Sequence, residues 1–189
     1  LTVYAFSTEN WKRPKAEVDF LLTLMRKTMR NEIDELIENG VKVQFLGRRK
    51  NLSEKMVKEI KYIEEKSSQK TKLTLNIAFN YGGRAEITDA AKKMAADYSK
   101  REIDLNDFDE DDFSNYLYDG ELKNVELLIR TGGDLRLSNF LLWQSAYAEL
   151  YFTDIFWPDF KEKDLKQAID DFKKRERRFG GLEDGDKNA

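Results

Sequence analysis

Two arginines flank a glycine pair at the point where an apolar run of this chain ends. In order along the chain these features are Val125–Ile129, Arg130, Gly132-Gly133, Arg136 and Ser138. Glycine lets backbone N–H groups approach a ligand closely, a helix N-terminus attracts anions, and arginine matches phosphate oxygens. We therefore predict a strand, a turn and a helix over 139–144, capped by Ser138 or Asn139, that together hold a phosphate or diphosphate.

A simpler interpretation of this loop remains open. Loops between strands and helices often carry glycine and serine for turning and capping alone. Arginine directly after the strand and again before the helix is poorly explained by turn chemistry, so Arg130 and Arg136 favour anion binding.

Glu149 interrupts an otherwise apolar run from Tyr147 to Phe152. A carboxylate is costly in such a place unless it is paired or bound to a metal ion. Two explanations stay open: a salt bridge with Arg130, or a Mg²⁺ ion shared with a bound diphosphate.

Two further polar loops follow strand-like runs, after Phe6 and after Phe79. If the strands are parallel, their C-terminal ends and the loops after them share one sheet edge, where ligands bind in open α/β sheets. The three loops would bring together hydroxyls, an amide and cations, namely Ser7, Thr8, Asn10, Arg13, Arg84, Arg130, Arg136 and Ser138. This set predicts an anionic ligand, and neither GxGxxG nor GxxxxGK[ST] occurs to suggest a nucleotide.

The elements that must position these loops alternate between strands and helices. Apolar spacing predicts strands at 1–6, 41–47, 73–79 and 125–129, a short edge strand at 150–153, and helices up to Glu38, after Ser53, after Arg84 and through Phe172. The acidic run Asp109–Asp112 favours the first turn of a helix over 113–117 rather than a metal site. The chain is predicted to be an α/β protein, with a mostly parallel central sheet covered by helices on both faces, in one domain ending in a loose tail at 182–189.

Composition narrows the function. A net charge of −3 with 37% charged residues gives no indication of a nucleic-acid partner. Cysteine and histidine are both absent, which excludes disulfides, thiolate or imidazole metal sites and the commonest general base. With no long apolar run and no signal pattern, we expect a cytoplasmic protein.

The loop motifs, in this order and spacing, resemble those of cis-prenyltransferases, most closely the bacterial undecaprenyl diphosphate synthases. They are Tyr4–Trp11 with Arg13-Pro14, Asn80–Arg84, Arg130–Gly133, Arg136–Phe140, Trp143-Gln144 and Trp157–Phe160. The resemblance implies a Mg²⁺-dependent homodimer that condenses isopentenyl diphosphate onto farnesyl diphosphate, producing a long polyprenyl diphosphate for cell-wall lipid carrier synthesis. Its apolar product implies transient contact with a membrane surface.

The resemblance also implies roles for individual residues. Asn10 would take part in removing the proton from isopentenyl diphosphate, as a positioning or relay group because an amide is a weak base. Glu149 would be a Mg²⁺ ligand, and Arg178-Phe179-Gly180 would reach the partner subunit's site. The implied substrate-binding residues are Ser7, Thr8, Glu9, Trp11 and Arg13 in the first loop, with Arg130, Arg136, Leu137 and Ser138 for isopentenyl diphosphate.

One motif of the family is absent. Its Asp-Gly-Asn-Gly-Arg-Trp loop, which holds the allylic diphosphate, does not occur in the printed sequence. We therefore expect that the N-terminal strand and catalytic loop of a longer enzyme are missing from it. An alternative of another class is a non-catalytic, prenyl-diphosphate-binding subunit of the same fold.

Overall fold

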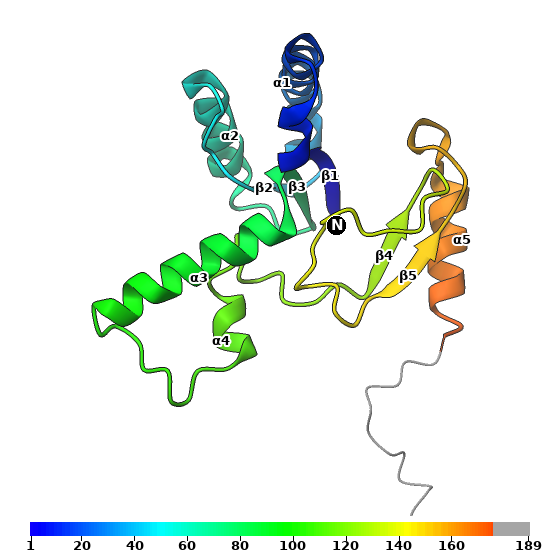
Figure 1. Ribbon diagram of the computed structural model, residues 1–189. Helices are drawn as coiled ribbons and strands as arrows, with labels where there is room; N and C mark the ends of the chain where they lie inside the picture. Colours follow the sequence, from blue (N-terminus) through cyan, green and yellow to red (C-terminus); the bar gives the residue numbers. More distant parts are fainter. Residues whose placement is uncertain (176–189) are drawn as a thin grey trace, which may run out of the picture. The chain divides into compact units, whose positions relative to one another are not determined.

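A computed structural model describes residues 1–175, and strands and helices alternate along them (Figure 1). The elements are β1 (Thr2–Ser7), η1 (Thr8–Lys12), α1 (Lys15–Glu38), β2 (Val41–Leu46), α2 (Glu54–Ser67), β3 (Leu73–Tyr81), α3 (Gly83–Ser99), α4 (Glu110–Ser114), β4 (Leu127–Arg130), β5 (Glu149–Phe152), η2 (Trp157–Asp159) and α5 (Glu162–Phe172). Every strand pair among them is parallel. The predicted α/β class is confirmed.

Residue contacts divide the chain into two compact units. The first comprises Leu1–Lys123 and Ser138–Ala146 and carries a sheet of order β1-β3-β2. The second comprises, within the described residues, Asn124–Leu137 and residues 147–175, and it carries the pair β4-β5. The alternation of strands and helices in the sequence does not reveal this division.

The core of the first unit lies where α1 and α2 pack against the sheet. Val43, Phe45, Ile60 and Phe79 are each at most 5% exposed. Burying an aliphatic or aromatic side chain of this size contributes about 1.5–3 kcal/mol, so this cluster stabilises the packing of α2 on β2 and β3. The two loops that follow β1 and β3 leave the sheet at the same edge, as predicted. The expectation that the loop after Arg130 shares this edge is wrong, because β4 belongs to a separate two-stranded sheet.

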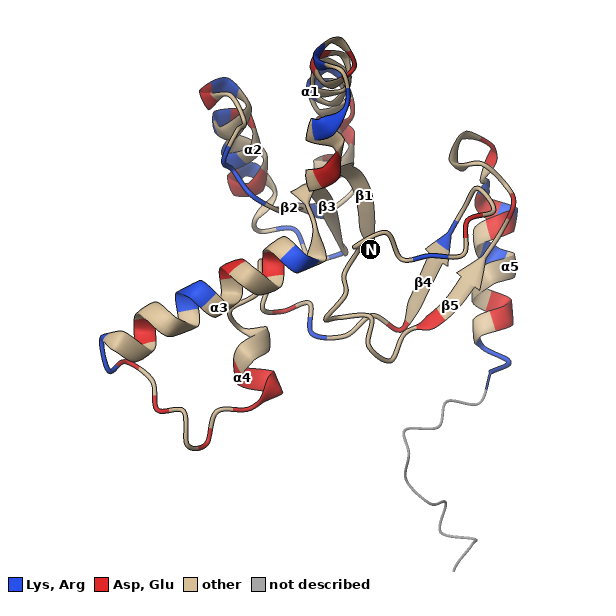
Figure 2. Cartoon of the chain, in the orientation of Figure 1, with Lys and Arg blue, Asp and Glu red and all other residues tan. Residues whose placement is uncertain are grey.

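The helices of this unit begin and end where the sequence indicates. Ser53 caps α2 by accepting a hydrogen bond from the Met56 N–H at 3.2 Å. Helix α1 ends at Glu38, before Gly40, whose φ of +83° is one that glycine adopts without strain. The acidic run also behaves as predicted in kind, because it forms the first turn of α4, which carries acidic residues in Figure 2. Asp109 is the N-cap, and the helix starts at Glu110.

In the second unit, β4 and β5 pair in register from Leu127 with Glu149 to Arg130 with Phe152. The predicted edge strand therefore begins one residue earlier, at Glu149 itself. Helix α5 follows as predicted. The tail at 182–189 and the Arg178-Phe179-Gly180 element lie outside the described residues.

The helix predicted over 139–144 is wrong. These residues form turns, and Ser138, Asn139 and Leu141 have φ values of +50°, +63° and +44°. Left-handed residues cannot continue a right-handed helix. The expected anion site at that helix N-terminus is therefore not formed.

None of the helices within residues 1–175 is both long and apolar enough to span a bilayer.

Candidate functional site

The turn after β1 is closed by its own side chains. Asn10 Oδ1 accepts a hydrogen bond from the Ser7 N–H at 2.7 Å, and Ser7 Oγ accepts one from the Asn10 N–H at 3.2 Å. This reciprocal capping fixes the plane of the Asn10 amide. Because Oδ1 is held by the backbone, Nδ2 is the atom that Asn10 can present to a ligand as a hydrogen-bond donor.

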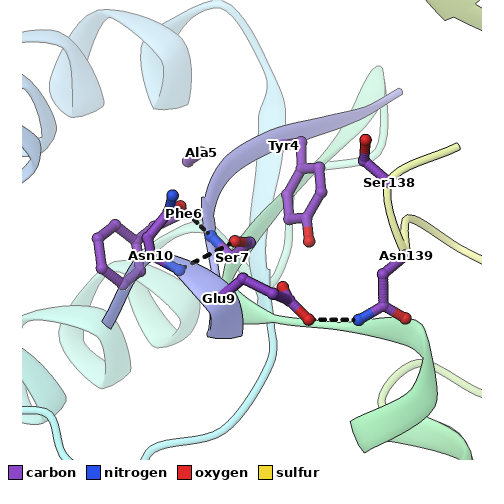
Figure 3. A pocket seen from close by; sticks show the side chains of 8 residues that line it. All are labelled: Tyr4, Ala5, Phe6, Ser7, Glu9, Asn10, Ser138 and Asn139. Carbon is purple, nitrogen blue, oxygen red and sulfur yellow. Dashed lines mark hydrogen bonds between the residues drawn. The ribbon is translucent and has the colours of Figure 1, made fainter. Parts of the chain in front are cut away.

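A pocket of about 510 Å³ opens beside this turn (Figure 3). Its walls are partly apolar and partly polar, and they comprise Tyr4, Ala5, Phe6, Ser7, Glu9, Asn10, Ser138 and Asn139. A volume of this size is in the range of small-molecule sites, which combine apolar walls with a few placed polar groups. Four of the predicted site residues, Ser7, Glu9, Asn10 and Ser138, are therefore brought together.

Tyr4 forms the apolar wall of the pocket. Its ring stacks on Phe140, with centroids 4.6 Å apart, and its hydroxyl donates to the Tyr81 carbonyl at 3.1 Å. Burial and the nearby negative charge of Glu9 raise the pKa of Tyr4 to about 12. The hydroxyl is thus a fixed neutral donor at physiological pH and has no role as a base.

Glu9 is the acidic group of the pocket. Burial alone would raise its pKa, but backbone hydrogen bonds and the bond from Asn139 Nδ2 at 2.9 Å outweigh burial and lower it. The carboxylate is consequently ionised at neutral pH, and its Oε1 is held by Asn139 although the side chain is exposed.

The other first-loop residues have structural partners. Trp11 Nε1 donates to Asn80 Oδ1 at 2.7 Å, and its ring packs edge-on against Phe6. Arg13 is exposed and pairs with Glu17 one helical turn onward. Of these two predicted site residues, neither lines the pocket.

Thr8 also stands outside the pocket lining, but it lies against the second loop. A Cβ added at Gly82 would be 2.5 Å from Thr8 Oγ1. Only glycine therefore allows the loop after β3 to approach the turn after β1 this closely.

The two arginines of the third loop converge in the second unit. Arg130 Nη2 and Arg136 Nη2 both donate to Asp134 Oδ2, at 2.8 and 2.6 Å. Arg136 keeps 65% of its side chain exposed. Two guanidinium groups gathered on one oxygen form a locally cationic surface of the kind that binds phosphate.

The glycine pair has a different task from the one predicted. Gly132 and Gly133 have φ of +85° and +78°, so the turn does require glycine. Their N–H groups, however, donate to the carbonyls of Ile155 and Thr153 at 2.9 and 3.0 Å. These amides hold the loop against the chain after β5 and are therefore already engaged within the protein.

Glu149 is paired, though not with the partner considered from the sequence. Its Oε2 accepts from Arg175 Nη1 at 2.9 Å, while Arg175 Nη2 bonds Asp171. The salt bridge with Arg130 is therefore not formed, because Arg130 is turned to Asp134.

The fit of this region to Mg²⁺ depends on substrate. Within residues 1–175 there is no cluster of three or more side chains able to ligate a metal. Glu149 offers a single carboxylate, and Mg²⁺ is commonly bound by one or two carboxylates together with substrate phosphates and water. The residues thus fit Mg²⁺ only when a diphosphate completes the ligand set.

Sequence reasoning missed four pocket residues as parts of the site, namely Tyr4, Ala5, Phe6 and Asn139. Tyr4 lies within the first strand, where an aromatic residue is expected in any case. Asn139 was assigned to the cap of its own helix, whereas its side-chain oxygen accepts from the Arg84 N–H, 55 residues away. No local signal identifies a partner at that separation.

The chain is similar to known proteins both in sequence and in fold. Residues 1–180 match the family model described as putative undecaprenyl diphosphate synthase. The isoprenyl transferases of Fusobacterium nucleatum and Thermotoga maritima are each 50% identical, over 96% and 98% of this chain and 76% and 78% of theirs. Among solved structures, lavandulyl diphosphate synthase from Lavandula x intermedia, in complex with dimethylallyl diphosphate, matches with a TM-score of 0.92 and 36% identity, over 96% of this chain and 78% of that one. A probable undecaprenyl diphosphate synthase from Campylobacter jejuni matches with 0.86 and 37%, over 96% and 83%.

Proposed function

We propose a specific reaction for this chain, which belongs to the undecaprenyl diphosphate synthase family of isoprenyl transferases. It condenses isopentenyl diphosphate successively onto farnesyl diphosphate. Membership supports cis-prenyl chain elongation by a prenyltransferase; the substrates, the undecaprenyl product and its use as a cell-wall lipid carrier are our proposal. The observation that carries it is the pocket beside the Ser7–Asn10 turn, which Asn10 lines together with Tyr4, Ala5 and Phe6.

The reaction sets the tasks of these residues. A bond forms between C4 of isopentenyl diphosphate and C1 of the allylic diphosphate, while the C1–O bond breaks and diphosphate leaves. A proton is then lost from C2 of the former isopentenyl unit. Charge therefore gathers on the leaving group, and groups placed in advance to stabilise it lower the barrier.

The arginines and Ser138 are proposed to bind the diphosphate of isopentenyl diphosphate, with Leu137 between them. Arg130 and Arg136 together already hold one anionic oxygen, Oδ2 of Asp134. This supports the role, because the same two side chains can hold an oxygen of the substrate diphosphate.

Asn10 is proposed to orient isopentenyl diphosphate through Nδ2. Its Oδ1 already accepts from the Ser7 N–H, which supports a donor role over that of a proton acceptor. Ser7, Thr8, Glu9, Trp11 and Arg13 then form and support the turn around Asn10.

Mg²⁺ is proposed as the cofactor, with Glu149 as its protein ligand. The ion, when bound, would neutralise charge on the diphosphate. Glu149 must then exchange its bond with Arg175 for the ion, and Arg175 remains bonded to Asp171.

We further propose a cytoplasmic homodimer whose product meets a membrane surface transiently. Phe156 and Trp157, which are 68% and 66% exposed in the second unit, provide apolar surface that a second copy of the chain could cover. Sedimentation of the purified protein tests this point.

The choice of acceptor tests the proposed function. Isopentenyl diphosphate is supplied with farnesyl or dimethylallyl diphosphate, and products are sized by mass spectrometry. We expect farnesyl diphosphate to be the better acceptor and a polyprenyl diphosphate of undecaprenyl length to be the main product. A short product made mainly from dimethylallyl diphosphate contradicts the assignment, and binding of both diphosphates without condensation indicates the non-catalytic subunit.

A further inference from the structure

Asn139 joins the loop at 138–141 to two other elements of the first unit. Its carbonyl accepts from the Gly83 N–H at 2.7 Å and its Oδ1 accepts from the Arg84 N–H at 2.8 Å. These are the open donors at the start of α3, whose own N-cap residue, Gly82, has no side chain to satisfy them. Asn139 thus caps a helix that is remote from it in sequence.

The third bond leads to the turn after β1. Asn139 Nδ2 donates to Glu9 Oε1 at 2.9 Å, and both residues line the pocket with Asn10 and Ser138 (Figure 3). A helix cap requires only the oxygen of the amide. The nitrogen therefore makes a separate connection between Ser138's loop and η1.

The backbone at this point is held in an unusual conformation. Asn139 has φ of +63° and lies beside Ser138 at +50°. Non-glycine residues persist there only when surrounding contacts fix them, and such positions concentrate at functional sites. Gly82 permits the close approach, because a Cβ on it would lie 2.7 Å from Asn139 Nδ2.

We propose that Asn139 is a positioning residue that sets the separation of Ser138 from the Glu9–Asn10 turn, and thereby the geometry in which isopentenyl diphosphate is held. This inference rests on the proposed function. It adds a role for the nitrogen atom of one side chain, acting through Glu9 rather than on the substrate.

The test exchanges donor and acceptor. Asn139→Asp keeps the oxygen that caps α3 but places a carboxylate against Glu9. Glu9→Gln in the same protein restores a donor, since Gln Nε2 can bond the new Asp. We expect Asn139→Asp to lower kcat/KM for isopentenyl diphosphate at least about tenfold, the scale of one hydrogen bond to a charged group. The double variant should recover most of that loss.

The pH profile separates positioning from capping. In Asn139→Asp the two carboxylates repel only when both are ionised, so the defect relative to the wild type should be larger at neutral pH than in the acidic range where one of the two acids is protonated. Asn106→Asp is the matched control, because Asn106 Nδ2 donates to Asp104 Oδ1 at 2.9 Å outside the pocket lining. It should leave the kinetics unchanged.

The outcomes are distinguishable. An active wild type with unchanged Asn139→Asp kinetics, or a Glu9→Gln change that adds to the defect rather than relieving it, overturns the positioning role alone. If Asn139→Asp lowers both the melting temperature and the activity, and Glu9→Gln restores neither, then Asn139 is only a helix cap and the positioning role is overturned as well. A wild type that condenses no isopentenyl diphosphate overturns the proposed function itself.

Discussion

Ser7 and Asn10 exchange hydrogen bonds across the turn after β1, each side chain accepting from the other residue's backbone N–H at 3.2 and 2.7 Å. The arrangement separates the two atoms of the Asn10 amide. Oδ1 serves the fold, and Nδ2 is the donor that we propose Asn10 presents to the substrate. Structure and activity should therefore respond differently to substitution at this position.

Asn10→Asp keeps the capping oxygen and removes the amide donor. We expect stability close to that of the wild type but turnover reduced at least about tenfold, the scale of a lost hydrogen bond to a charged group. Asn10→Ala should lose turnover and also about 1 kcal/mol of stability with the cap. Urea unfolding and single-turnover kinetics measure both. An Asn10→Asp enzyme that keeps full turnover contradicts the donor role.

Arg136 should act mainly through the affinity for isopentenyl diphosphate. It is well exposed, and its guanidinium contacts Asp134. Arg136→Ala is expected to raise the KM for isopentenyl diphosphate about tenfold or more and to lower turnover, because a charge-assisted bond to diphosphate is lost. Lys163→Ala removes an exposed cation from α5 in the same unit and serves as control. Equal kinetics of the two variants would sink the assignment.

Asp89 makes stability depend on pH. Its Oδ2 and Oδ1 accept from Arg48 Nε and Nη2, both at 2.7 Å, and Tyr118 donates to Oδ2. The Arg48 hydrogen bonds lower the pKa of Asp89 against the opposing effect of burial. The unfolded pKa is about 3.9, so this stabilisation is present above pH 4 and is lost as pH falls through the lower, folded pKa.

Asp89→Asn should therefore lower the free energy of unfolding at pH 7 by about 1 kcal/mol, allowing for partial exposure. The difference from the wild type should shrink as the pH falls below 4. Asp34→Asn removes an exposed pair with Lys66 and should change little. Denaturant unfolding at several pH values decides the matter, and a difference that stays constant down to pH 2 contradicts the sign of the shift.

Glu149→Gln tests the metal ligand. The amide still accepts a bond from Arg175, but it is a weaker ligand for Mg²⁺ than a carboxylate. We expect half-maximal activity to require at least about tenfold more Mg²⁺, with the melting temperature little changed. Asp171→Asn, which alters the other partner of Arg175, is the control. An unchanged Mg²⁺ requirement in Glu149→Gln removes Glu149 from the metal site.

The sequence predicted what depends on local pattern. Helix α1 follows from its apolar spacing and α2 from the Ser53 cap, and the shared edge of β1 and β3 follows from parallel pairing. The helix prediction for 139–144 is wrong because the apolar residues there have helical spacing, whereas Asn139 accepts a hydrogen bond from the Arg84 N–H, 55 residues away. Glu149 likewise pairs with Arg175, which is 26 residues away. Partners at such separations depend on tertiary packing, which periodicity does not encode.

The central claim is that this protein elongates prenyl diphosphates. The most direct measurement is incorporation of labelled isopentenyl diphosphate into butanol-extractable product, with farnesyl diphosphate and Mg²⁺, on protein whose mass has been verified. We predict incorporation that grows with time, stops when a chelator is added and falls with Asn10→Ala. No incorporation by the intact protein, despite measurable binding of farnesyl diphosphate, would contradict the account.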